Sequence, residues 1–252
     1  MKDISLARGA DPARDRQIQS NLNRDRLPKH LGIVLDGNRR WARARSYLDV
    51  SEGHRIGFEK IPEVLAWCDD RGIRTVTLWM LSSDNIRNRS QTELEALYEI
   101  DEDVVRKLVA TRRFRVRLIG CSEMLPDRLS ALLREAEQET AQLDAIQVNL
   151  AIGYGGREDL LDAISSLIAE ILATGDTDIT AERLAAHLST AGQPDPDLII
   201  RTSGEKRTSG FLLWQAALAE YYFCDCHWPD FSESELDKAL RTYGARQRRF
   251  GA

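Results

Sequence analysis

Short apolar segments alternate with amphipathic segments along most of this sequence, and that alternation limits the possible folds more than any other feature. Buried strands are indicated over five ranges: 30–36, 71–81, 114–120, 145–154 and 197–204. Helical spacing of apolar residues occupies six further ranges: 54–71, 91–110, 126–143, 157–172, 179–188 and 232–250. Strand–helix alternation predicts an α/β protein with a mostly parallel central sheet flanked by helices. Residues 211–223 are apolar and fit a strand or a helix equally well.

The chain of 252 residues contains no Pro/Gly/Ser-rich linker long enough to separate two domains. We therefore expect one domain over 29–252, preceded by a flexible or loosely helical leader over 1–28. The net charge of −5 argues against a nucleic-acid partner, although local basic clusters could hold small anions. The leader lacks the apolar centre of a secretory signal, and no apolar run approaches the ~20 residues of a transmembrane helix. These features predict a cytoplasmic protein whose four cysteines stay reduced.

The first candidate for chemistry is HLGIVLDGNRRWAR at 30–43, where an apolar strand runs directly into charged residues. Ligands of open parallel sheets bind beyond the carboxyl ends of the strands, which is where Asp36 falls. Gly37 and Asn38 can form a tight turn before a helix with two arginines, and helix starts and guanidinium groups both attract phosphate. An aspartate beside a phosphate indicates a bridging Mg²⁺. The alternative is an aspartate that caps a helix followed by solvated arginines.

A second polar cluster lies in the sequence DLIIRTSGEKRTSG at 197–210. The guanidinium groups of Arg201 and Arg207 and the hydroxyl groups of Ser203 and Ser209 could form another anion pocket. An exposed polar loop is the competing interpretation. Two anion pockets in one chain would indicate two phosphorylated ligands or one long one.

Three other signals are weaker. The segment LSSDN at 81–85 offers Ser82 and Asn85 beyond another strand, although a simple helix cap explains them as well. His54 lies at a predicted helix start, where a structural or exposed histidine is the ordinary case. The CDCH sequence at 224–227 lacks the partner ligands that a zinc site needs. The nucleotide-binding motifs G-x-G-x-x-G and G-x-x-x-x-G-K-[ST] are absent from the sequence.

Seven segments of this sequence, in order, resemble the cis-prenyltransferases, the undecaprenyl diphosphate synthase family. They are HLGIVLDGNRRWA, EGHRIG, LWMLSSDN, NLAIGYGGRED, DPDLIIRTSGEKRTSGFLLWQAALAEYYF, HWPDF and the terminal RRFG. The resemblance leaves only the leader uncovered. It implies a parallel sheet flanked by helices, with an apolar tunnel for the growing chain.

The resemblance also implies a reaction. An allylic diphosphate loses its diphosphate group, the double bond of isopentenyl diphosphate attacks the allylic carbon, and a proton leaves to form a Z double bond. Such a step requires stabilisation of the departing diphosphate and placement of two substrates, which matches two anion pockets. The implied cofactor is Mg²⁺, the implied primer is geranyl, farnesyl or dimethylallyl diphosphate, and the implied assembly is a homodimer.

Residue roles follow from the same resemblance. Asp36 would position Mg²⁺ and diphosphate, with Glu220 as the second acidic metal position. His54 and Asn85 would assist diphosphate departure or proton removal. The residues assigned to binding the substrates are Gly37, Asn38, Arg39, Arg40, Trp41, Met80, Ser82, Arg201, Arg207 and Ser209. The C-terminal residues assigned to a neighbouring subunit's site are Arg249 and Gly251.

Several positions depart from the family pattern. Arg39 stands where glycine is common, and Val50 stands where longer-chain members often carry an arginine for the diphosphate. The loss at Val50 weakens the expected allylic grip, and Arg39 could compensate for it. The family arginine downstream of Asn85 is either Arg87 or Arg89.

Met80 is the departure with the greatest consequence. Long-chain members tend to carry alanine at this tunnel position, and overfilling a confined apolar space costs ~1–3 kcal/mol. Short-chain members carry bulk here, together with the variant SGFLLWQ found at 209–215. We therefore expect a short product, (2Z,6E)-farnesyl diphosphate made from geranyl diphosphate. A long-chain Z-polyprenyl diphosphate synthase is the alternative, because a flexible methionine could swing aside.

Two other classes of protein compete with this enzyme as interpretations of the sequence. A non-catalytic partner subunit of the same family typically lacks the catalytic aspartate, which this chain retains as Asp36. A generic nucleotide-binding α/β protein would explain the phosphate pockets but not the order of the motifs.

Overall fold

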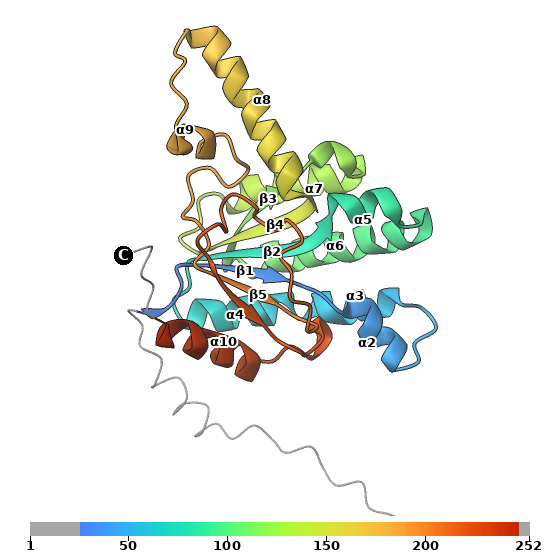
Figure 1. Cartoon of the computed structure of the whole chain (residues 1–252). Coiled ribbons are helices and arrows are strands. Elements are labelled where there is room, and N and C mark those ends of the chain that lie inside the picture. The colour runs from blue at the N-terminus through green and yellow to red at the C-terminus, as the bar shows by residue number, and fades with distance from the viewer. Residues whose placement is uncertain (1–25, 247–252) are drawn as a thin grey trace, which may run out of the picture.

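A six-stranded sheet, parallel throughout, forms the centre of the molecule, and the predicted α/β class is confirmed (Figure 1). The computed structural model describes residues 26–246. The strands are β1 (His30–Val34), β2 (Thr75–Ser82), β3 (Phe114–Ile119), β4 (Ile146–Tyr154), β5 (Leu198–Arg201) and β6 (Glu220–Phe223). The helices are α2 (Asn38–Ala44), α3 (Ser51–Glu59), α4 (Ile61–Asp70), α5 (Ser83–Asn88), α6 (Gln91–Thr111), α7 (Asp127–Thr140), α8 (Gly156–Thr174), α9 (Ala181–Ala185) and α10 (Glu233–Ala245), with short 3-10 turns η2 (Ser122–Met124) and η3 (Trp228–Asp230).

The order of the strands, β3-β4-β2-β1-β5-β6, fixes the place of a ligand site. From β1 the chain adds β2, β3 and β4 on one side, with β4 inserted between β2 and β3, and it then crosses to the other side of β1 to add β5 and β6. The direction reverses between β1 and β5, which makes the carboxyl ends of these two strands the topological switch point. Open α/β sheets bind their ligands in the crevice at that point.

The two faces of the sheet are covered differently. On one face Leu31 and Ile33 of β1 belong to the large core that α3, α4, α6, α7 and α10 complete. On the other face Val34 packs with Phe211 and Leu212, which come from the turns before β6. All five residues of β1 are buried, as expected for a central parallel strand with both faces covered.

Several element boundaries differ from the sequence prediction. The helix predicted over 54–71 is two helices, α3 and α4, because Pro62 lies in the first turn of α4 and has no N–H to continue the preceding helix. The strand predicted to start at 71 starts at Thr75, after a turn in which Gly72 has a φ of +79°. The predicted helices over 179–188 and 232–250 shorten to α9 and α10, the latter within the described part of the chain.

The ambiguous segment 211–223 is neither a continuous helix nor a continuous strand. Ser209, Gly210 and Leu212 all have positive φ values, so the backbone turns repeatedly before it enters β6. These turns cover one face of the sheet with side chains instead of with a helix.

The predicted leader over 1–28 lies almost entirely outside the described residues. Of its last positions, Leu27 packs against the large core. Between residues 26 and 246, none of the helices combines the length and the apolar character needed to cross a bilayer.

Candidate active site

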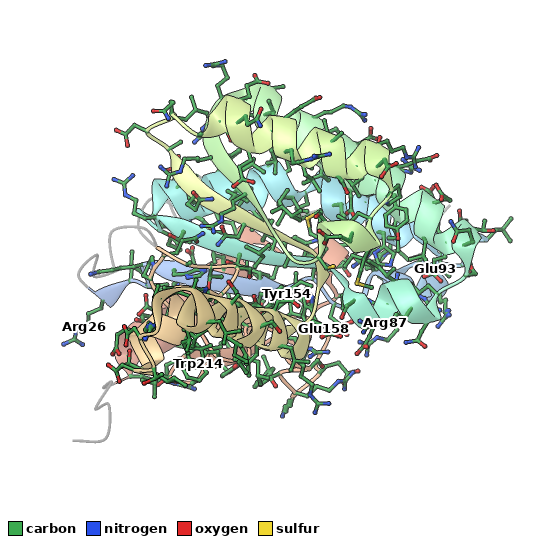
Figure 2. The ribbon with its side chains drawn as sticks, turned by 90° about the horizontal axis from the view of Figure 1, so that it is seen from above. Arg26, Arg87, Glu93, Tyr154, Glu158 and Trp214 are labelled. Atoms are coloured by element: carbon green, nitrogen blue, oxygen red, sulfur yellow. The ribbon has the colours of Figure 1, made fainter. Side chains whose placement is uncertain are left out.

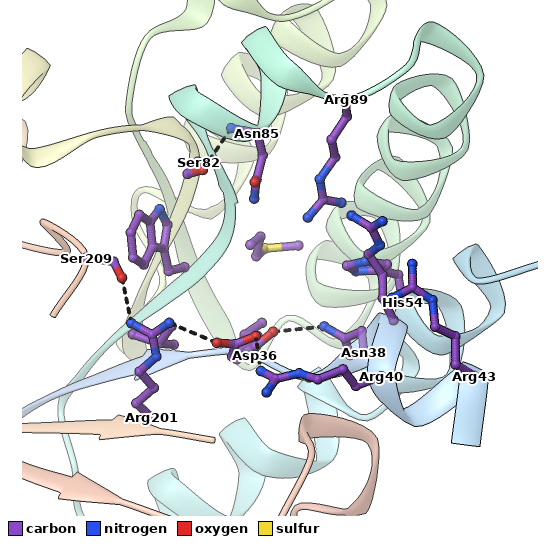
Figure 3. A pocket seen from close by; sticks show the side chains of 16 residues that line it. Asp36, Asn38, Arg40, Arg43, His54, Ser82, Asn85, Arg89, Arg201 and Ser209 are labelled. Carbon is purple, nitrogen blue, oxygen red and sulfur yellow. Dashed lines mark hydrogen bonds and ion pairs between the residues drawn. The ribbon is translucent and has the colours of Figure 1, made fainter. Parts of the chain in front are cut away.

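Asp36 and Arg201 meet at the switch point, where β1 and β5 end side by side. Val34 is paired with Arg201 in the sheet register, so the two residues that follow β1 bring Asp36 beside that arginine. One carboxylate oxygen of Asp36 accepts a hydrogen bond from Nη2 of Arg201 at 2.9 Å, and the other accepts one from Nη2 of Arg40 at 3.3 Å (Figure 3). The backbone N–H of Asp36 donates to the hydroxyl of Thr202 at 2.9 Å. Backbone and side-chain contacts together fix the carboxylate at the rim of the sheet.

Gly37 and Asn38 shape the turn that follows. Gly37 has a φ of +100°, and a Cβ at this position would lie 2.6 Å from Nδ1 of His227 and 2.9 Å from Cβ of Ser203. The side-chain amide of Asn38 is buried and donates to the carbonyl of Leu35 at 2.8 Å. Both residues line the site, and their observed contacts hold the start of α2 against the end of β1.

A cavity of about 470 Å³ opens above this edge of the sheet. Its lining residues are Val34, Leu35, Asp36, Gly37, Asn38, Arg39, Arg40, Arg43, His54, Trp79, Met80, Ser82, Asn85, Arg89, Arg201 and Ser209. Five of them are arginines, and Asp36 is the one carboxylate in the lining. The cavity therefore carries a large excess of positive charge and suits an anionic ligand with several oxygen atoms.

The second predicted anion pocket is only partly assembled. Nη1 of the buried Arg201 donates to the hydroxyl of Ser209 at 2.8 Å and to the carbonyl of Arg207 at 2.7 Å. The guanidinium group of Arg207 does not reach the cavity, because it forms an ion pair with Glu205 at the surface. Glu205 also holds Nη1 of Arg40 at 2.7 Å. The structure thus brings Arg201 and Ser209 together and leaves Arg207 outside.

Trp41 is also outside the cavity, although the sequence predicted it as a substrate contact. Its indole Nε1 donates to Asp230 of η3 at 2.8 Å, and its ring stacks on Tyr47 with the guanidinium of Arg45 above it. Helical spacing on α2 explains the difference, because residues 39, 40 and 43 line the cavity while residue 41 faces η3.

His54 is a buried residue of α3 whose ring forms part of the cavity wall. Neither ring nitrogen has a hydrogen-bond partner among the described residues. Burial, followed by the positive charges of Arg89 and Arg39, lowers the pKa of His54 to about 3. The imidazole is therefore neutral at pH 7 and keeps both nitrogens available for a ligand.

Ser82, Asn85 and Arg89 complete the opposite wall. The hydroxyl of Ser82 accepts from the backbone N–H of Asn85 at 3.0 Å and caps α5. Arg89 lines the cavity and pairs with Glu93 at 3.1 Å, whereas Arg87 turns to the surface and pairs with Glu158 at 2.6 Å (Figure 2). The arginine that faces the site after Asn85 is therefore Arg89.

Met80 lines the cavity and lies at a β-bulge in β2. The register pairs Trp79 with Ala151 and Leu81 with Ile152, so Met80 is an extra residue without a partner on β4. Such a bulge re-aims a side chain. It allows the consecutive residues Trp79 and Met80 to line one cavity, and Met80 at the same time belongs to the large core.

Glu220 does not share a site with Asp36 within one chain, and its role as a second metal ligand stays a prediction. Glu220 opens β6, and the register matches it with Leu198 and, through β5, with Leu31. Asp36 lies five residues beyond Leu31, and a strand advances ~3.3 Å per residue. Glu220 is therefore too far from Asp36 for the two carboxylates of one chain to bind the same metal ion, whose ligands lie within a few Å of one another. The carboxylate of Glu220 instead forms an ion pair with Arg246. Arg249 and Gly251 lie outside the described residues.

Arg43 was missed by the sequence analysis. It follows Arg39 by four residues on α2, so helical periodicity places both guanidinium groups on one face. Extending the predicted helix by one turn beyond Arg39 would have found it.

A parallel sheet with an arginine-lined cavity at its switch point is typical of α/β enzymes that act on phosphorylated ligands. Residues 34–251 match the prenyltransferase family described as putative undecaprenyl diphosphate synthase. The chain belongs to this family, and its members are prenyltransferases.

Individual relatives agree with that assignment. The (2Z,6E)-farnesyl diphosphate synthase of Thermobifida fusca is 49% identical over 94% of this chain and 95% of that protein. Isoprenyl transferase 1 of Streptomyces avermitilis is 46% identical over 94% of this chain and 93% of that protein. The crystal structure of lavandulyl diphosphate synthase from Lavandula x intermedia, in complex with dimethylallyl diphosphate, superimposes with a TM-score of 0.86 at 34% identity, covering 90% of this chain and 100% of that one.

Proposed function

We propose that this chain condenses isopentenyl diphosphate with a short allylic diphosphate to give a short Z-prenyl diphosphate, (2Z,6E)-farnesyl diphosphate from geranyl diphosphate. The observation that carries the proposal is one cavity that is lined by five arginines together with Asp36 and has the bulky Met80 in its apolar wall. The catalytic domain is assigned to residues 29–252, after a leader over 1–28. The relatives named as short-chain Z-isoprenyl and (2Z,6E)-farnesyl diphosphate synthases support the same product class.

The arginines on α2 and Arg89 are assigned to the allylic diphosphate. When the allylic carbon–oxygen bond breaks, the diphosphate takes the electron pair, and preorganised guanidinium groups stabilise that developing charge. Isopentenyl diphosphate is assigned to Arg201 and Ser209. Its double bond then attacks the allylic carbon, and loss of a proton forms the new Z double bond. Arg207 joins this site by exchanging Glu205 for phosphate, since its guanidinium group is exposed and its one ion-pair partner among residues 26–246 is that carboxylate.

Mg²⁺ is the metal assigned to this site. Asp36 fits it, because Mg²⁺ in such sites uses one or two carboxylates together with substrate phosphates. The ion, when bound, supplies further stabilisation of the departing diphosphate. To hold the ion, Asp36 would give up part of its contact with Arg40. That hydrogen bond, at 3.3 Å, is longer than the 2.9 Å bond between Asp36 and Arg201. Glu220 could contribute only from a second chain.

The lowered pKa of His54 bears on its role. A neutral imidazole with a pKa of about 3 is a poor base in the empty site but a competent N–H donor. We therefore assign His54 to a hydrogen bond with a diphosphate oxygen, beside the side-chain amide of Asn85. A bound diphosphate would raise the pKa of His54 and strengthen that bond.

Product length gives the test of the proposal. Extracted products from labelled isopentenyl diphosphate, geranyl diphosphate and Mg²⁺ would be separated by thin-layer chromatography. The wild-type chain should give a C15 product, and Met80→Ala should give longer ones. Met124→Ala, which removes a methionine outside the cavity lining, should leave the length unchanged. Long-chain products from the wild type would favour a polyprenyl diphosphate synthase. A complete lack of isopentenyl incorporation would refute the proposed prenyltransferase activity.

A homodimer in the cytoplasm is part of the proposal. Figure 1 shows α8 rising away from the sheet. Its apolar residues Leu161, Ile164, Ile168 and Leu172 recur at helical spacing and are 63%, 39%, 51% and 80% exposed. An apolar stripe of this length on one helix is typical of a subunit interface. Ile168→Asp should shift the sedimentation coefficient from dimer to monomer, while Ser165→Asp on the same helix should have a smaller effect.

A further inference from the structure

Two cysteines lie close together directly after the last strand of the sheet. Cys224 and Cys226 flank Asp225 in a bend that follows β6, and their sulfur atoms are 3.3 Å apart. Both are free cysteines in the structure, so the contact is a hydrogen bond between two thiol groups. A disulfide bond holds its sulfur atoms about 2.05 Å apart, so closing one here requires a movement of only about 1 Å.

The other two cysteines of the chain have different surroundings. Cys68 is fully buried in the large core. Cys121 is partly exposed, and its thiol donates to the carboxylate of Glu123 at 3.2 Å. Burial and that carboxylate raise the pKa of Cys121, so it stays a thiol near pH 7. Cys121 is therefore a natural control, with a thiol that bonds to oxygen instead of to sulfur.

The two sulfur atoms of the pair differ in their burial. Cys224 is 4% exposed, whereas Cys226 is partly accessible to solvent. A buried sulfur is the costlier one to ionise, so Cys224 keeps its proton and donates it to Cys226. This hydrogen bond lowers the pKa of Cys226 and raises that of Cys224. A solvent oxidant therefore meets a sulfur with thiolate character, with a second thiol directly behind it.

A metal site is the competing interpretation of this pair. The carboxylate of Glu235 lies with the two sulfur atoms in a group whose members are all within 4.8 Å of one another. Among residues 26–246 this group offers three donors, one fewer than a structural zinc site uses. Glu235 is also paired with Lys238, whose positive charge disfavours a bound cation. The geometry therefore favours chemistry between the sulfur atoms themselves.

We propose that Cys224 and Cys226 form a reversible disulfide on exposure to a hydroperoxide, with Cys226 as the attacking cysteine and Cys224 as the resolving one. The thiolate of Cys226 attacks one peroxide oxygen, the O–O bond breaks, and the departing hydroxide takes up the proton that Cys226 had released. Cys226 is then a sulfenic acid. The sulfur of Cys224 attacks it, the S–OH bond breaks, and the Cys224 proton leaves with the hydroxyl as water. The pair loses two electrons, and hydrogen peroxide becomes two molecules of water.

The bend that carries the pair is hydrogen-bonded to the loop after β5. The backbone N–H of Ser203 donates to the carbonyl of Cys226 at 2.7 Å, and that of Gly204 donates to the carbonyl of Cys224 at 2.8 Å. The N–H of Cys224 donates to the carbonyl of Arg201 at 2.9 Å. Ser203 has a φ of +81°, a conformation that L residues rarely adopt, and these bonds hold the loop in it. A movement of the bend is therefore passed to the loop.

This loop carries Arg201 and Ser209, so the expected effect on activity rests on the proposed function, in which they bind isopentenyl diphosphate. Misplacing a binding group by about 1 Å can cost up to about a hundredfold. The residues assigned to the allylic diphosphate come from α2 and from Arg89, and they should respond less. Oxidation of the pair should thus weaken mainly the use of isopentenyl diphosphate.

Peptide mapping tests the disulfide independently of any activity. The reduced full chain would be treated with hydrogen peroxide, alkylated and digested with trypsin, which releases residues 208–238 with both cysteines of the pair and no other. This peptide should become lighter by two hydrogen atoms and resist alkylation until dithiothreitol is added, while Cys121 is alkylated throughout. Dimedone, which traps sulfenic acids, should label Cys226 in Cys224→Ser and should leave Cys224 unlabelled in Cys226→Ser.

Initial rates then measure the consequence for the substrates. Peroxide treatment of the wild type should raise the KM of isopentenyl diphosphate about tenfold and that of geranyl diphosphate less than about threefold. Dithiothreitol should restore both values. Cys226→Ser should show no such response, and Cys121→Ser should respond like the wild type.

Four results would overturn the inference. An unmodified 208–238 peptide, or a disulfide between two chains, would refute the pair itself. Dimedone on Cys224 in Cys226→Ser would refute the assigned roles. A disulfide that leaves the KM of isopentenyl diphosphate unchanged would show that the bend does not act on the loop. A reduced wild-type chain without turnover would instead refute the proposed function, while peptide mapping would still decide whether the disulfide forms.

Discussion

Buried polar side chains at the amino edge of the parallel sheet differ in their hydrogen bonding from those at the carboxyl edge. The two buried histidines show the difference. At the amino edge, His30 bonds through both ring nitrogens, to the carbonyl of Pro194 at 2.7 Å and to the hydroxyl of Thr77 at 2.8 Å. At the carboxyl edge, His54 has no bond at either nitrogen among the described residues. Burial lowers the pKa of both rings, so both are neutral, but only the second offers free hydrogen-bonding atoms.

The arginines at the two edges repeat the contrast. Arg71 at the amino edge donates to Asp237 at 2.7 Å, to Glu233 at 2.8 Å and to the carbonyl of Trp67 at 2.9 Å. At the carboxyl edge, both Arg89 and Arg201 keep an Nε–H without a partner in the described structure. One edge is satisfied internally and holds the fold together. The other keeps hydrogen-bonding capacity for a ligand, and four predictions test this division.

Removing the central carboxylate should have the largest effect. We expect Asp36→Ala to lower kcat by about a thousandfold, the upper range for losing one group that stabilises charge in a transition state. Circular dichroism should show a folded protein, because Asp36 lies at the rim and not in the core. Incorporation of labelled isopentenyl diphosphate measures the rate, and turnover at the wild-type rate would contradict the assignment.

The amino edge should respond in stability instead. Arg71→Met leaves Asp237 buried without its partner, and breaking such a pair typically costs about 3–5 kcal/mol. Urea denaturation would measure the free energy of unfolding. Turnover per folded molecule should stay within about twofold of the wild type, since Arg71 is outside the cavity lining. If Arg71→Met were stable but inactive, the assignment of structural side chains to the amino edge and ligand-binding side chains to the carboxyl edge would be contradicted.

The neighbouring arginines after Asn85 sharpen the comparison within the carboxyl edge. Arg89→Ala should raise the KM of the allylic substrate about 30-fold, because charge-assisted hydrogen bonds contribute about 2 kcal/mol. Arg87→Ala removes an exposed ion pair with Glu158, which is worth little. Its KM should change less than about twofold. Equal effects of the two variants would show that the cavity is not the binding site.

The pH dependence of stability should reveal His54. Its pKa is about 3 in the folded chain and about 6.5 when unfolded, so the unfolded chain takes up a proton that the folded chain does not. Stability from this residue is present above pH 6.5 and is lost as the pH falls toward 3. Between pH 7 and pH 5 the loss is about 2 kcal/mol. Urea denaturation at both pH values should show that much less dependence in His54→Gln, and identical dependence in both proteins would mean that His54 titrates normally.

Strand ends made much of the site predictable from the sequence. Asp36 and Arg201 each fall at the end of an apolar run, and parallel strands bring such ends to one edge. Ser82 and Asn85 follow a third strand in the same way. The pattern needed only the order of strands and helices, which is the strongest signal in the sequence.

Other features depended on information that local patterns lack. The start of β6 at Glu220 could not be located, because the apolar run 211–223 and the residues just before it contain several left-handed turns. The direction in which Trp41 points depends on Asp230, which the tertiary fold brings to it, and that of Arg207 depends on the conformation of the loop that it shares with Glu205. Arg87 and Arg89 are two residues apart, and only the short helix α5 between β2 and α6 decides which faces inward.

The unpaired position of Met80 has a consequence for how relatives of this chain can diverge. Residue 80 has no register partner on β1 or β4, so exchanging it breaks no direct cross-strand pair of side chains. On the proposed function, the depth of the hydrocarbon channel could be lengthened or shortened by one codon. The backbone of the sheet would stay the same, and the size of the side chain at this one position would set the length of the product.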